Sequence, residues 1–332
     1  MTQSREVRLK DRPVGLPSAK NFELATVTPG APGPGEVQVK NTWMTVDPYM
    51  RGRMYAGPSY SAPFNVGEAM TGGAIGEVIA SNAPSLKPGD IVRSFMGWRE
   101  AFNAPADQLE KLDTMGLAPQ LFLGAAGMPG LTAWAGLMRV AAFKPGDTVF
   151  VSGAAGAVGS MVAQIARLKG GKVIGSAGGA DKIAYLNAIG VHGAIDYKAV
   201  PDLTRALLAA APDGIDVYFD NVGGGHLEAA LNAAKLHARF AICGGISAYN
   251  NIGATPGPSN FLLIVGKRIR MEGFIVSDHA DMAKDYVPQL AAWVKDGKVD
   301  VRETVAHGIE NAVDAFLQLF SGGNLGKMLV KL

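Results

Sequence analysis

The clearest hydrophobic pattern stands near the middle of the chain. Thr148 to Val151 are apolar or β-branched in succession, which predicts a short buried strand. Gly153 interrupts the run, and residues 157–169 continue without proline up to two glycines, which predicts a helix. Gly156 and Gly159 have the spacing of the second half of G-x-G-x-x-G. A strand, a glycine turn and a helix in this order are typical of a turn that binds a dinucleotide, because glycines let the backbone approach a pyrophosphate and the helix N-terminus offers N–H groups.

The patterns on the two sides of this stretch differ. Residues 1–115 show short alternating runs separated by turn-forming clusters, which predicts a small barrel or sandwich. From about residue 118, strand and helix patterns alternate, which predicts an α/β fold with a doubly wound parallel sheet. The helix at 309–320 and the strand at 326–332 do not extend that sheet and are candidates to return to the first part.

The strands expected first are 22–28, 36–43, 73–80, 89–95 and 100–104. The strands expected later are 148–151, 172–176, 193–197, 215–220, 237–243 and 269–275. The other helices expected are 118–126, 132–140, 181–189, 201–211, 224–234, 260–266 and 281–295.

Composition favours a two-domain soluble enzyme. The chain has 332 residues, of which 48% are hydrophobic and 18% charged. Its 31 Lys and Arg nearly balance 29 Asp and Glu, and no basic stripe suggests a nucleic-acid partner. The apolar runs are far shorter than the roughly 20 residues that a membrane span requires. The first 13 residues are charged and lack the apolar segment of a signal peptide, so we expect a cytoplasmic protein.

The cysteine and histidine content argues against a metal site. Cys243 is the single cysteine, so neither an intramolecular disulfide nor a Cys-rich zinc lobe can form. The five histidines are scattered without the spacing of metal ligands. We expect a metal-free mechanism, with Cys243 as a small buried hydrophobic residue and not a nucleophile.

The end of the strand at 172–176 bears on the choice between NAD and NADP. An acid at this point would bind the ribose 2′-hydroxyl of NAD, and the expected position holds small residues instead. Small residues leave room for a 2′-phosphate, and Lys182 can supply the opposite charge. In the alternative interpretation, Asp181 caps the next helix and Lys182 is simply exposed. We favour NADP, since an acid facing a phosphate would be repelled.

Two further strand ends carry polar side chains. Asn221 follows the strand at 215–220, where it can bind a cofactor or simply form a turn. Tyr249 follows the strand at 237–243, where it can place a phenol near a substrate or be an ordinary loop tyrosine.

Six motifs in order along the chain resemble those of one enzyme family. These segments are Val46–Arg51, Gly127–Ala133, Ala154–Gly159, Tyr218–Gly224, Ala241–Asn250 and Gly323–Lys327. Together they resemble the zinc-independent medium-chain dehydrogenase/reductase superfamily. Within it, the chain is most similar to the prostaglandin reductase / leukotriene B4 12-hydroxydehydrogenase branch, with its bacterial curcumin-reductase-like and plant alkenal double-bond reductase relatives.

The resemblance implies a domain arrangement and a cofactor. It implies a GroES-like β-barrel catalytic domain from residues 1–122 with 298–332, and a Rossmann NADP-binding domain from residues 123–297. NADPH would lie between them, and two copies would form a homodimer through the strand at 269–275. The implied cofactor-binding residues are Gly156, Ala157, Val158, Gly159, Lys182, Tyr197, Asn221, Cys243, Ser247, Tyr249, Phe274, Ile275, Val276 and Asn324.

Two departures from the family pattern stand out. Gly153 occupies a position where relatives more often carry alanine or serine, and we expect it to loosen the turn. An insert around Met54 to Pro63, rich in Tyr, Pro and Ser, borders the expected substrate entrance and puts the substrate preference in doubt.

The reaction that the resemblance implies is reduction of the carbon–carbon double bond of an α,β-unsaturated ketone or aldehyde. NADPH would give hydride to the β-carbon, and negative charge would build on the carbonyl oxygen. A preorganised hydrogen-bond donor to such an oxygen typically lowers the barrier by roughly 3–4 kcal/mol. We expect Tyr249 and the cofactor ribose to supply donors, and Tyr49 and Tyr60 to orient the substrate.

Three other functions were weighed. A quinone reductase would share the fold and the cofactor but deliver hydride to a quinone. A non-catalytic NADPH-binding protein would share the turn and not the chemistry. A zinc alcohol dehydrogenase is disfavoured by the cysteine count.

Overall fold

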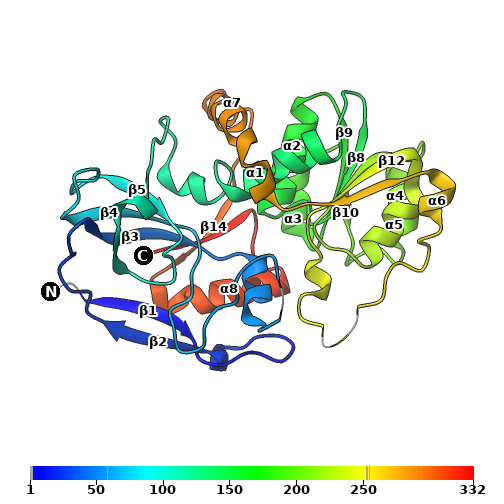
Figure 1. Cartoon of the computed structure of the whole chain (residues 1–332). Helices are drawn as coiled ribbons and strands as arrows, with labels where there is room; N and C mark the ends of the chain where they lie inside the picture. Colours follow the sequence, from blue (N-terminus) through cyan, green and yellow to red (C-terminus); the bar gives the residue numbers. More distant parts are fainter. Residues whose placement is uncertain (1–2, 58, 252, 254) are drawn as a thin grey trace. The chain divides into compact units, whose positions relative to one another are not determined.

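A computed structural model describes residues 3–57, 59–251, 253 and 255–332. Contacts within the chain divide it into two compact units. The first unit comprises Met1–Leu123, Glu303–Asn324 and Met328–Leu332, and the second comprises Gly124–Arg302 and Leu325–Lys327. In Figure 1 the chain runs through the first unit in blue and cyan, through the second from green to orange, and back into the first in red.

The second unit is built on a six-stranded parallel sheet within the described residues. Its strands stand in the order β10-β9-β8-β11-β12-β13. This is the order of a doubly wound sheet, in which the chain starts at the centre and crosses to the other half after β10. The predicted doubly wound parallel sheet is confirmed. The strands are β8 (Thr148–Val151), β9 (Lys172–Ala177), β10 (Gly193–Asp196), β11 (Ile215–Asp220), β12 (Ala234–Ile242) and β13 (Arg270–Gly273).

Helices connect these strands and bury the sheet. The sheet's central strand, β8, is buried at all four positions, as a continuous apolar run predicts. The aromatic rings of Phe150 and Tyr218 stack with centroids 5.2 Å apart between β8 and β11. Figure 1 shows α4, α5 and α6 gathered on one side of the sheet. The helices are α1 (Met128–Ala135), α2 (Ala157–Leu168), α3 (Ala180–Ala188), α4 (Leu203–Ala210), α5 (Gly225–Ala233), α6 (Leu263–Lys267) and α7 (Ala283–Lys295).

Two predicted helices differ from the observed structure. The helix predicted at 118–126 is a short 3-10 turn over Pro119–Leu123, because glycines at 124 and 127 follow it at once. The helix predicted at 132–140 begins earlier, at Met128, and ends as an α-helix at Ala135. A π-helical turn, Gly136–Val140, continues it.

The first unit contains a seven-stranded sheet and a separate strand pair within the described residues. The sheet has the order β14-β15-β3-β4-β5-β7, with β6 also paired to β3. The expected return of the C-terminus is confirmed, because Leu329 pairs with Thr45 and Val330 with Met44. The strands are β1 (Ser4–Leu9), β2 (Phe22–Val27), β3 (Glu36–Thr45), β4 (Ala74–Ser81), β5 (Ile91–Ser94), β6 (Ala101–Pro105), β7 (Glu110–Lys111), β14 (Glu303–His307) and β15 (Lys327–Lys331).

Both ends of the chain build the core of this unit. The helix α8 (Ala312–Ser321) buries Phe316, whose ring lies edge-on to Phe22 at 6.3 Å and to Trp98 at 6.0 Å. The first unit therefore depends on the last 30 residues as much as on the first hundred.

Candidate functional site

The predicted site residues of the second unit follow the carboxyl ends of its parallel strands. Since parallel strands end at the same edge of a sheet, these segments share one edge, which is where ligands bind in doubly wound folds. The glycine turn comes after β8, and Lys182 comes after β9. Tyr197 follows β10, and Asn221 follows β11. The loop after β12 contains Cys243, Ser247 and Tyr249, and the segment after β13 contains Phe274, Ile275 and Val276.

The glycine turn is tight for steric reasons. Gly153 has a φ of +60°, a left-handed conformation that glycine adopts without strain. This glycine therefore suits the turn, where the sequence suggested that it would loosen it. A β-carbon on Gly159 would lie 2.3 Å from the Gly153 carbonyl oxygen, so α2 approaches the turn as closely as glycine allows. No side chain caps α2 at Gly156, and its first N–H groups, at Ala157, Val158 and Gly159, are those that a helix leaves without internal partners.

A short segment from the C-terminal part of the chain lies against this turn. The Gly326 N–H donates to the Ala155 carbonyl oxygen at 2.8 Å, and Gly326 forms a parallel bridge with Gly156. Gly326 has a φ of +67°, and a β-carbon there would lie 2.0 Å from the Arg302 carbonyl oxygen. Gly326 therefore fits closely against Arg302 while its backbone pairs with the glycine turn, which the sequence alone did not reveal.

A buried carboxylate organises the end of β11. Asp220 is 1% exposed, and its Oδ1 accepts hydrogen bonds from the Tyr218 hydroxyl at 2.7 Å and the Ser152 hydroxyl at 3.0 Å. The same oxygen accepts the N–H groups of Val222 at 2.9 Å and Gly223 at 2.8 Å. Four donors compensate the burial of the charge, and the carboxylate ties the glycine turn after β8 to the loop after β11.

Asn221 is fixed by the same network. Its side-chain Nδ2 donates to the Ser152 carbonyl oxygen at 2.8 Å, and its backbone N–H donates to the Ser152 hydroxyl at 2.9 Å. The structure therefore gives the Asn221 amide nitrogen a structural partner at the glycine turn. Its role toward a cofactor stays a prediction.

Hydrogen bonds hold the loop after β12 against the loop after β11. The N–H groups of Cys243 and Gly244 both donate to the Asp220 carbonyl oxygen, at 2.9 and 3.0 Å. The Ser247 hydroxyl donates to the Val222 carbonyl oxygen at 2.6 Å. A short 3-10 turn, Ile246–Ala248, then leads to Tyr249, whose side chain is half-buried.

The Tyr249 hydroxyl folds back over the start of its own loop. A β-carbon on Gly244 would lie 2.9 Å from the Tyr249 hydroxyl oxygen, so a larger residue there would displace the phenol from this position. The structure thus places the Tyr249 phenol over Gly244, in the loop that follows β12 at the carboxyl edge of the sheet. Cys243, in the same loop, is not poised as a nucleophile, since burial and the charge of Asp220 raise the pKa of its thiol to about 12.

Two lysines and a tyrosine gather where β9 and β10 end. A β-carbon on Gly178 would lie 2.8 Å from Lys198 Cε and 3.0 Å from Tyr197 Cζ, so both side chains lie over this glycine. Burial, and then the positive charge of Lys198, lower the pKa of Lys182. Asp181 lies exposed in the first turn of α3, where an acid favours the helix dipole.

Lys198 is a further candidate for the site, and the sequence pattern did not point to it. It follows Tyr197 directly after β10, and β10 pairs in parallel with β9. That pairing was the signal that could have found it, because neighbouring parallel strands bring their following residues together.

Phe274 packs into the second unit at the end of β13. Its ring lies 6.1 Å from Phe219 and 5.9 Å from His279. A β-carbon on Gly136, at the start of the π-helical turn, would lie 2.5 Å from both Phe219 Cε2 and Phe274 Cζ. Gly136 therefore lets these rings meet, and Phe274 fixes the segment that continues into Ile275 and Val276.

The remaining predicted residues, Tyr49, Tyr60 and Asn324, belong to the first unit. Burial raises the pKa of the half-buried Tyr49, and Asp47 adds to this while Arg53 opposes it. Tyr60 is 67% exposed. The substrate-binding roles of the two tyrosines and the cofactor role of Asn324 stay predictions.

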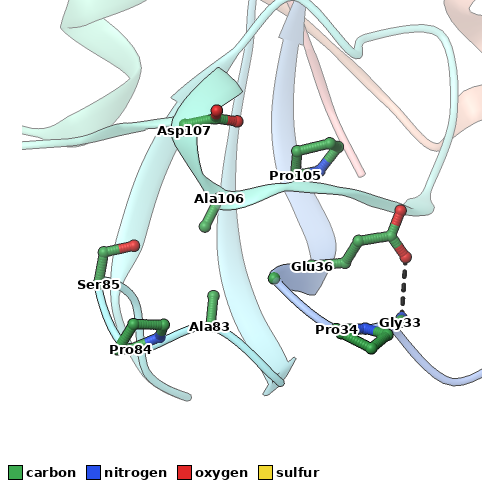
Figure 2. Close-up of a pocket in the computed structure, with 10 residues that line it drawn as sticks. Gly33, Pro34, Glu36, Ala83, Pro84, Ser85, Pro105, Ala106 and Asp107 are labelled. Atoms are coloured by element: carbon green, nitrogen blue, oxygen red, sulfur yellow. Dashed lines mark hydrogen bonds between the residues drawn. The ribbon is translucent and has the colours of Figure 1, made fainter.

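An open depression in the first unit has a different character (Figure 2). It is lined by small and proline-rich loops, and the Gly33 N–H donates to the Glu36 carboxylate at 2.9 Å along its rim. None of the predicted site residues lines it.

The described residues also bear on metal binding and on membrane insertion. Among the residues that the structure describes, no group of three or more His, Cys, Asp or Glu side chains could hold a metal ion. Within the same residues, none of the helices combines the length and the apolar character needed to cross a bilayer.

Two domain families match the chain. A family described as the N-terminal domain of oxidoreductase matches residues 5–112, and one described as zinc-binding dehydrogenase matches residues 157–295.

Three curated relatives match along the whole chain. The NADPH-dependent curcumin reductase of Escherichia coli K12 is 38% identical over 99% of this chain and 97% of its own length. The NADP(+)-dependent 2-alkenal reductase of Nicotiana tabacum is 41% identical over 98% and 97%. Prostaglandin reductase 1 of Mus musculus is 41% identical over the full length of both chains.

A solved structure matches equally well. CurA from Vibrio vulnificus, in complex with NADPH, has a TM-score of 0.93 and 38% identity over 98% of each chain. The GroES-like and Rossmann fold class that the sequence suggested is thereby confirmed.

Proposed function

Because the chain belongs to the medium-chain dehydrogenase/reductase family, in the branch of the curcumin, 2-alkenal and prostaglandin reductases, we propose that it is an NADPH-dependent enone and enal reductase. It reduces the carbon–carbon double bond of α,β-unsaturated ketones and aldehydes. The single observation that carries this proposal is the Tyr249 hydroxyl over Gly244, at the same sheet edge as the glycine turn.

The residues present fit NADPH at two points. The glycine turn and the uncapped start of α2 suit a pyrophosphate, since Gly159 leaves no side chain between helix and turn. Lys182 and Lys198 suit the 2′-phosphate, because burial and then the charge of Lys198 lower the pKa of Lys182, and a bound anion would relieve the repulsion between the two cations. We assign the second unit to the cofactor and the first unit, with Tyr49 and Tyr60, to the substrate.

Bound NADPH would supply the hydride to the β-carbon of the substrate, and the resulting enolate would take a proton from water at the α-carbon, which completes the reduction. The protein contributes a hydrogen-bond donor to the substrate carbonyl oxygen, which gains negative charge as the double bond is reduced. Tyr249 is the proposed donor, and its loop is held in advance by the bonds of Cys243, Gly244 and Ser247 to the 220–222 segment. A donor fixed before the reaction needs no reorganisation when the charge develops.

The test compares the wild type with Tyr249→Phe. We expect the variant to bind NADPH with unchanged Kd and to lose kcat on a reactive enone by about 10²- to 10³-fold, the typical effect of removing one such donor. Tyr185→Phe is a matched control, because the Tyr185 hydroxyl donates to the Asp300 carbonyl oxygen and lies outside the proposed site. Unchanged kcat in Tyr249→Phe would sink the assignment.

The substrate panel separates the other functions. Enones and enals are compared with the matching saturated carbonyl compounds and with quinones, following NADPH consumption and identifying the product. Faster turnover of quinones than of every enone would favour the quinone reductase. Tight NADPH binding without turnover of any acceptor would favour a non-catalytic protein.

We also propose that two copies associate as a homodimer through β13, in the cytoplasm. This strand ends the six-stranded order within the described residues, and its four residues are exposed or half-buried. Phe261, Leu262 and Val265, just before it, are 56%, 69% and 72% exposed, an apolar surface that a second copy would cover. The single cysteine supports a reducing compartment.

A further inference from the structure

His226 stands out because a ring nitrogen of its buried side chain has no hydrogen-bond partner among the described residues. It lies in the first turn of α5 and is 7% exposed. Its Nε2 is buried and finds no hydrogen-bond partner among the residues that the structure describes. A buried, unsatisfied donor or acceptor typically costs about 1–3 kcal/mol, which a leucine in the same place would avoid.

The neighbour of this imidazole is one of the predicted cofactor residues. The His226 ring lies edge to face with the Tyr197 ring, with centroids 5.0 Å apart and planes at 76°. Tyr197 is itself 40% exposed, and its Cζ lies over Gly178 beside Lys198. The Tyr197 ring therefore packs against a buried imidazole, while part of the Tyr197 side chain remains accessible to a ligand.

Two properties suit His226 for holding an aromatic ring in place. Edge-to-face ring pairs are favourable beyond the area they bury. Burial lowers the pKa of His226, opposed by the charge of Asp220, which favours the neutral ring against the Tyr197 phenol. The backbone N–H of His226 donates to the Gly223 carbonyl oxygen at 3.2 Å, which fixes the start of α5 to the loop after β11.

We propose that His226 is a positioning residue, which holds the Tyr197 ring in the orientation that receives the adenosine 2′-phosphate half of the cofactor. This inference rests on the proposed use of NADPH. It adds a residue from α5 to a subsite otherwise made from the ends of β9 and β10.

The test is a double-mutant cycle with 2′,5′-ADP as the probe, which carries the 2′-phosphate and lacks the nicotinamide. Calorimetry gives its Kd for the wild type, His226→Ala, Tyr197→Ala and the double variant, with 5′-AMP measured alongside. We expect His226→Ala to weaken 2′,5′-ADP binding about three- to tenfold, the magnitude of one aromatic pair. In the Tyr197→Ala background the same change should have less than about a twofold effect, because His226 acts through that ring.

Further variants separate ring packing from folding. His226→Phe keeps a ring and should restore most of the affinity, whereas His226→Gln keeps a polar group without a ring and should not. Thermal unfolding without ligand reports any general damage. His307→Ala, at an exposed position in the first unit, is the control for loss of a histidine.

The outcomes are distinct. An equal effect of His226→Ala in both backgrounds, or no effect on 2′,5′-ADP binding, would overturn the positioning role. An equal loss of 5′-AMP and 2′,5′-ADP binding would also overturn it, since the 2′-phosphate would then not be involved. A wild-type protein that does not bind 2′,5′-ADP at all would instead contradict the proposed cofactor.

Discussion

At the scale of single residues, Gly159 is the most constrained position of the glycine turn. A β-carbon there would lie 2.3 Å from the Gly153 carbonyl oxygen and 2.8 Å from Ala154 Cα, both backbone atoms. We expect Gly159→Ala to push α2 away from the turn, to lower the free energy of unfolding by about 1–3 kcal/mol, and to weaken NADPH binding by at least about tenfold. Urea unfolding and calorimetry measure the two effects.

Gly266 provides the matched control for this substitution. It lies in α6, and a β-carbon there would have no neighbour within 4 Å. Gly266→Ala should therefore leave NADPH binding unchanged and keep or slightly raise stability. If Gly159→Ala behaved like Gly266→Ala, the close approach of α2 to the glycine turn would matter neither for stability nor for NADPH binding.

Cys243 gives the protein a specific dependence on pH. Its pKa of about 12 lies above the roughly 8.5 of an unfolded thiol. The unfolded chain therefore releases this proton first, and stability falls as pH rises above about 8.5, by at most about 1.4 kcal/mol per pH unit. Urea unfolding between pH 8 and pH 10 should show a shallower decline for Cys243→Ala than for the wild type.

A chemical measurement checks the same property. Iodoacetamide at mildly alkaline pH should leave Cys243 intact in the native protein and modify it in urea, because only the thiolate reacts. Rapid alkylation of the native protein, or parallel pH slopes for the wild type and Cys243→Ala, would contradict the burial of this thiol.

Residue types in the sequence suggested part of the candidate site. The absence of an acid after β9 indicated Lys182, since charge complementarity depends on composition at a known offset. Lys198 and His226 were not predicted, because their contacts with Tyr197 join three segments that only the folded sheet brings together. Positive φ at Gly153 was equally invisible, since glycine is compatible with either sign.

At the scale of elements, one residue connects the ends of β8, β11 and β12 through its side chain and its backbone carbonyl. Asp220 accepts four hydrogen bonds on one oxygen, and its backbone carbonyl holds the loop that carries Tyr249. We expect Asp220→Ala to lower the free energy of unfolding by about 3–5 kcal/mol, because several buried donors lose their acceptor together. Urea unfolding measures the loss.

Asp220→Asn distinguishes the contributions of charge and acceptor. Its amide oxygen can still accept hydrogen bonds, so we expect a smaller loss than for alanine. Both variants should also lower the pKa of Cys243, because the charge of Asp220 helps to raise it. A change in stability below about 1 kcal/mol in Asp220→Ala would show that this carboxylate does not organise the strand ends.

Element prediction succeeded where one pattern dominated. The run at Thr148–Val151 and the proline-free stretch after it correspond to β8 and α2 within one residue. The sequence pattern did not predict β1, because three of its six residues are charged. The strand is established by its antiparallel pairing with β2, which a local pattern does not encode. The π-helical turn after α1 follows from ring packing around Gly136, which no local pattern encodes.

At the scale of the whole molecule, the edge of the parallel sheet at β13 is the proposed association surface. Val265 is 72% exposed just before β13, and a lysine there would place a charge in the proposed interface. We expect Val265→Lys to shift a dimer toward monomers in sedimentation measurements. Val14→Lys, on a residue 83% exposed in the first unit, is the control. A monomeric wild type would refute the proposed association outright.

The order of segments along the chain also bears on synthesis at the ribosome. Residues 124–302 emerge as one uninterrupted stretch, whereas β3 pairs at Thr45 with Leu329, almost at the end of the chain. At typical translation rates, roughly 15 to 60 s separate the emergence of these two partners. The unit whose synthesis begins first is therefore the last to be completed. Until then, the Trp43–Thr45 end of β3 lacks its β15 neighbour on the nascent chain, and one row of its backbone N–H and C=O groups is open to other partners.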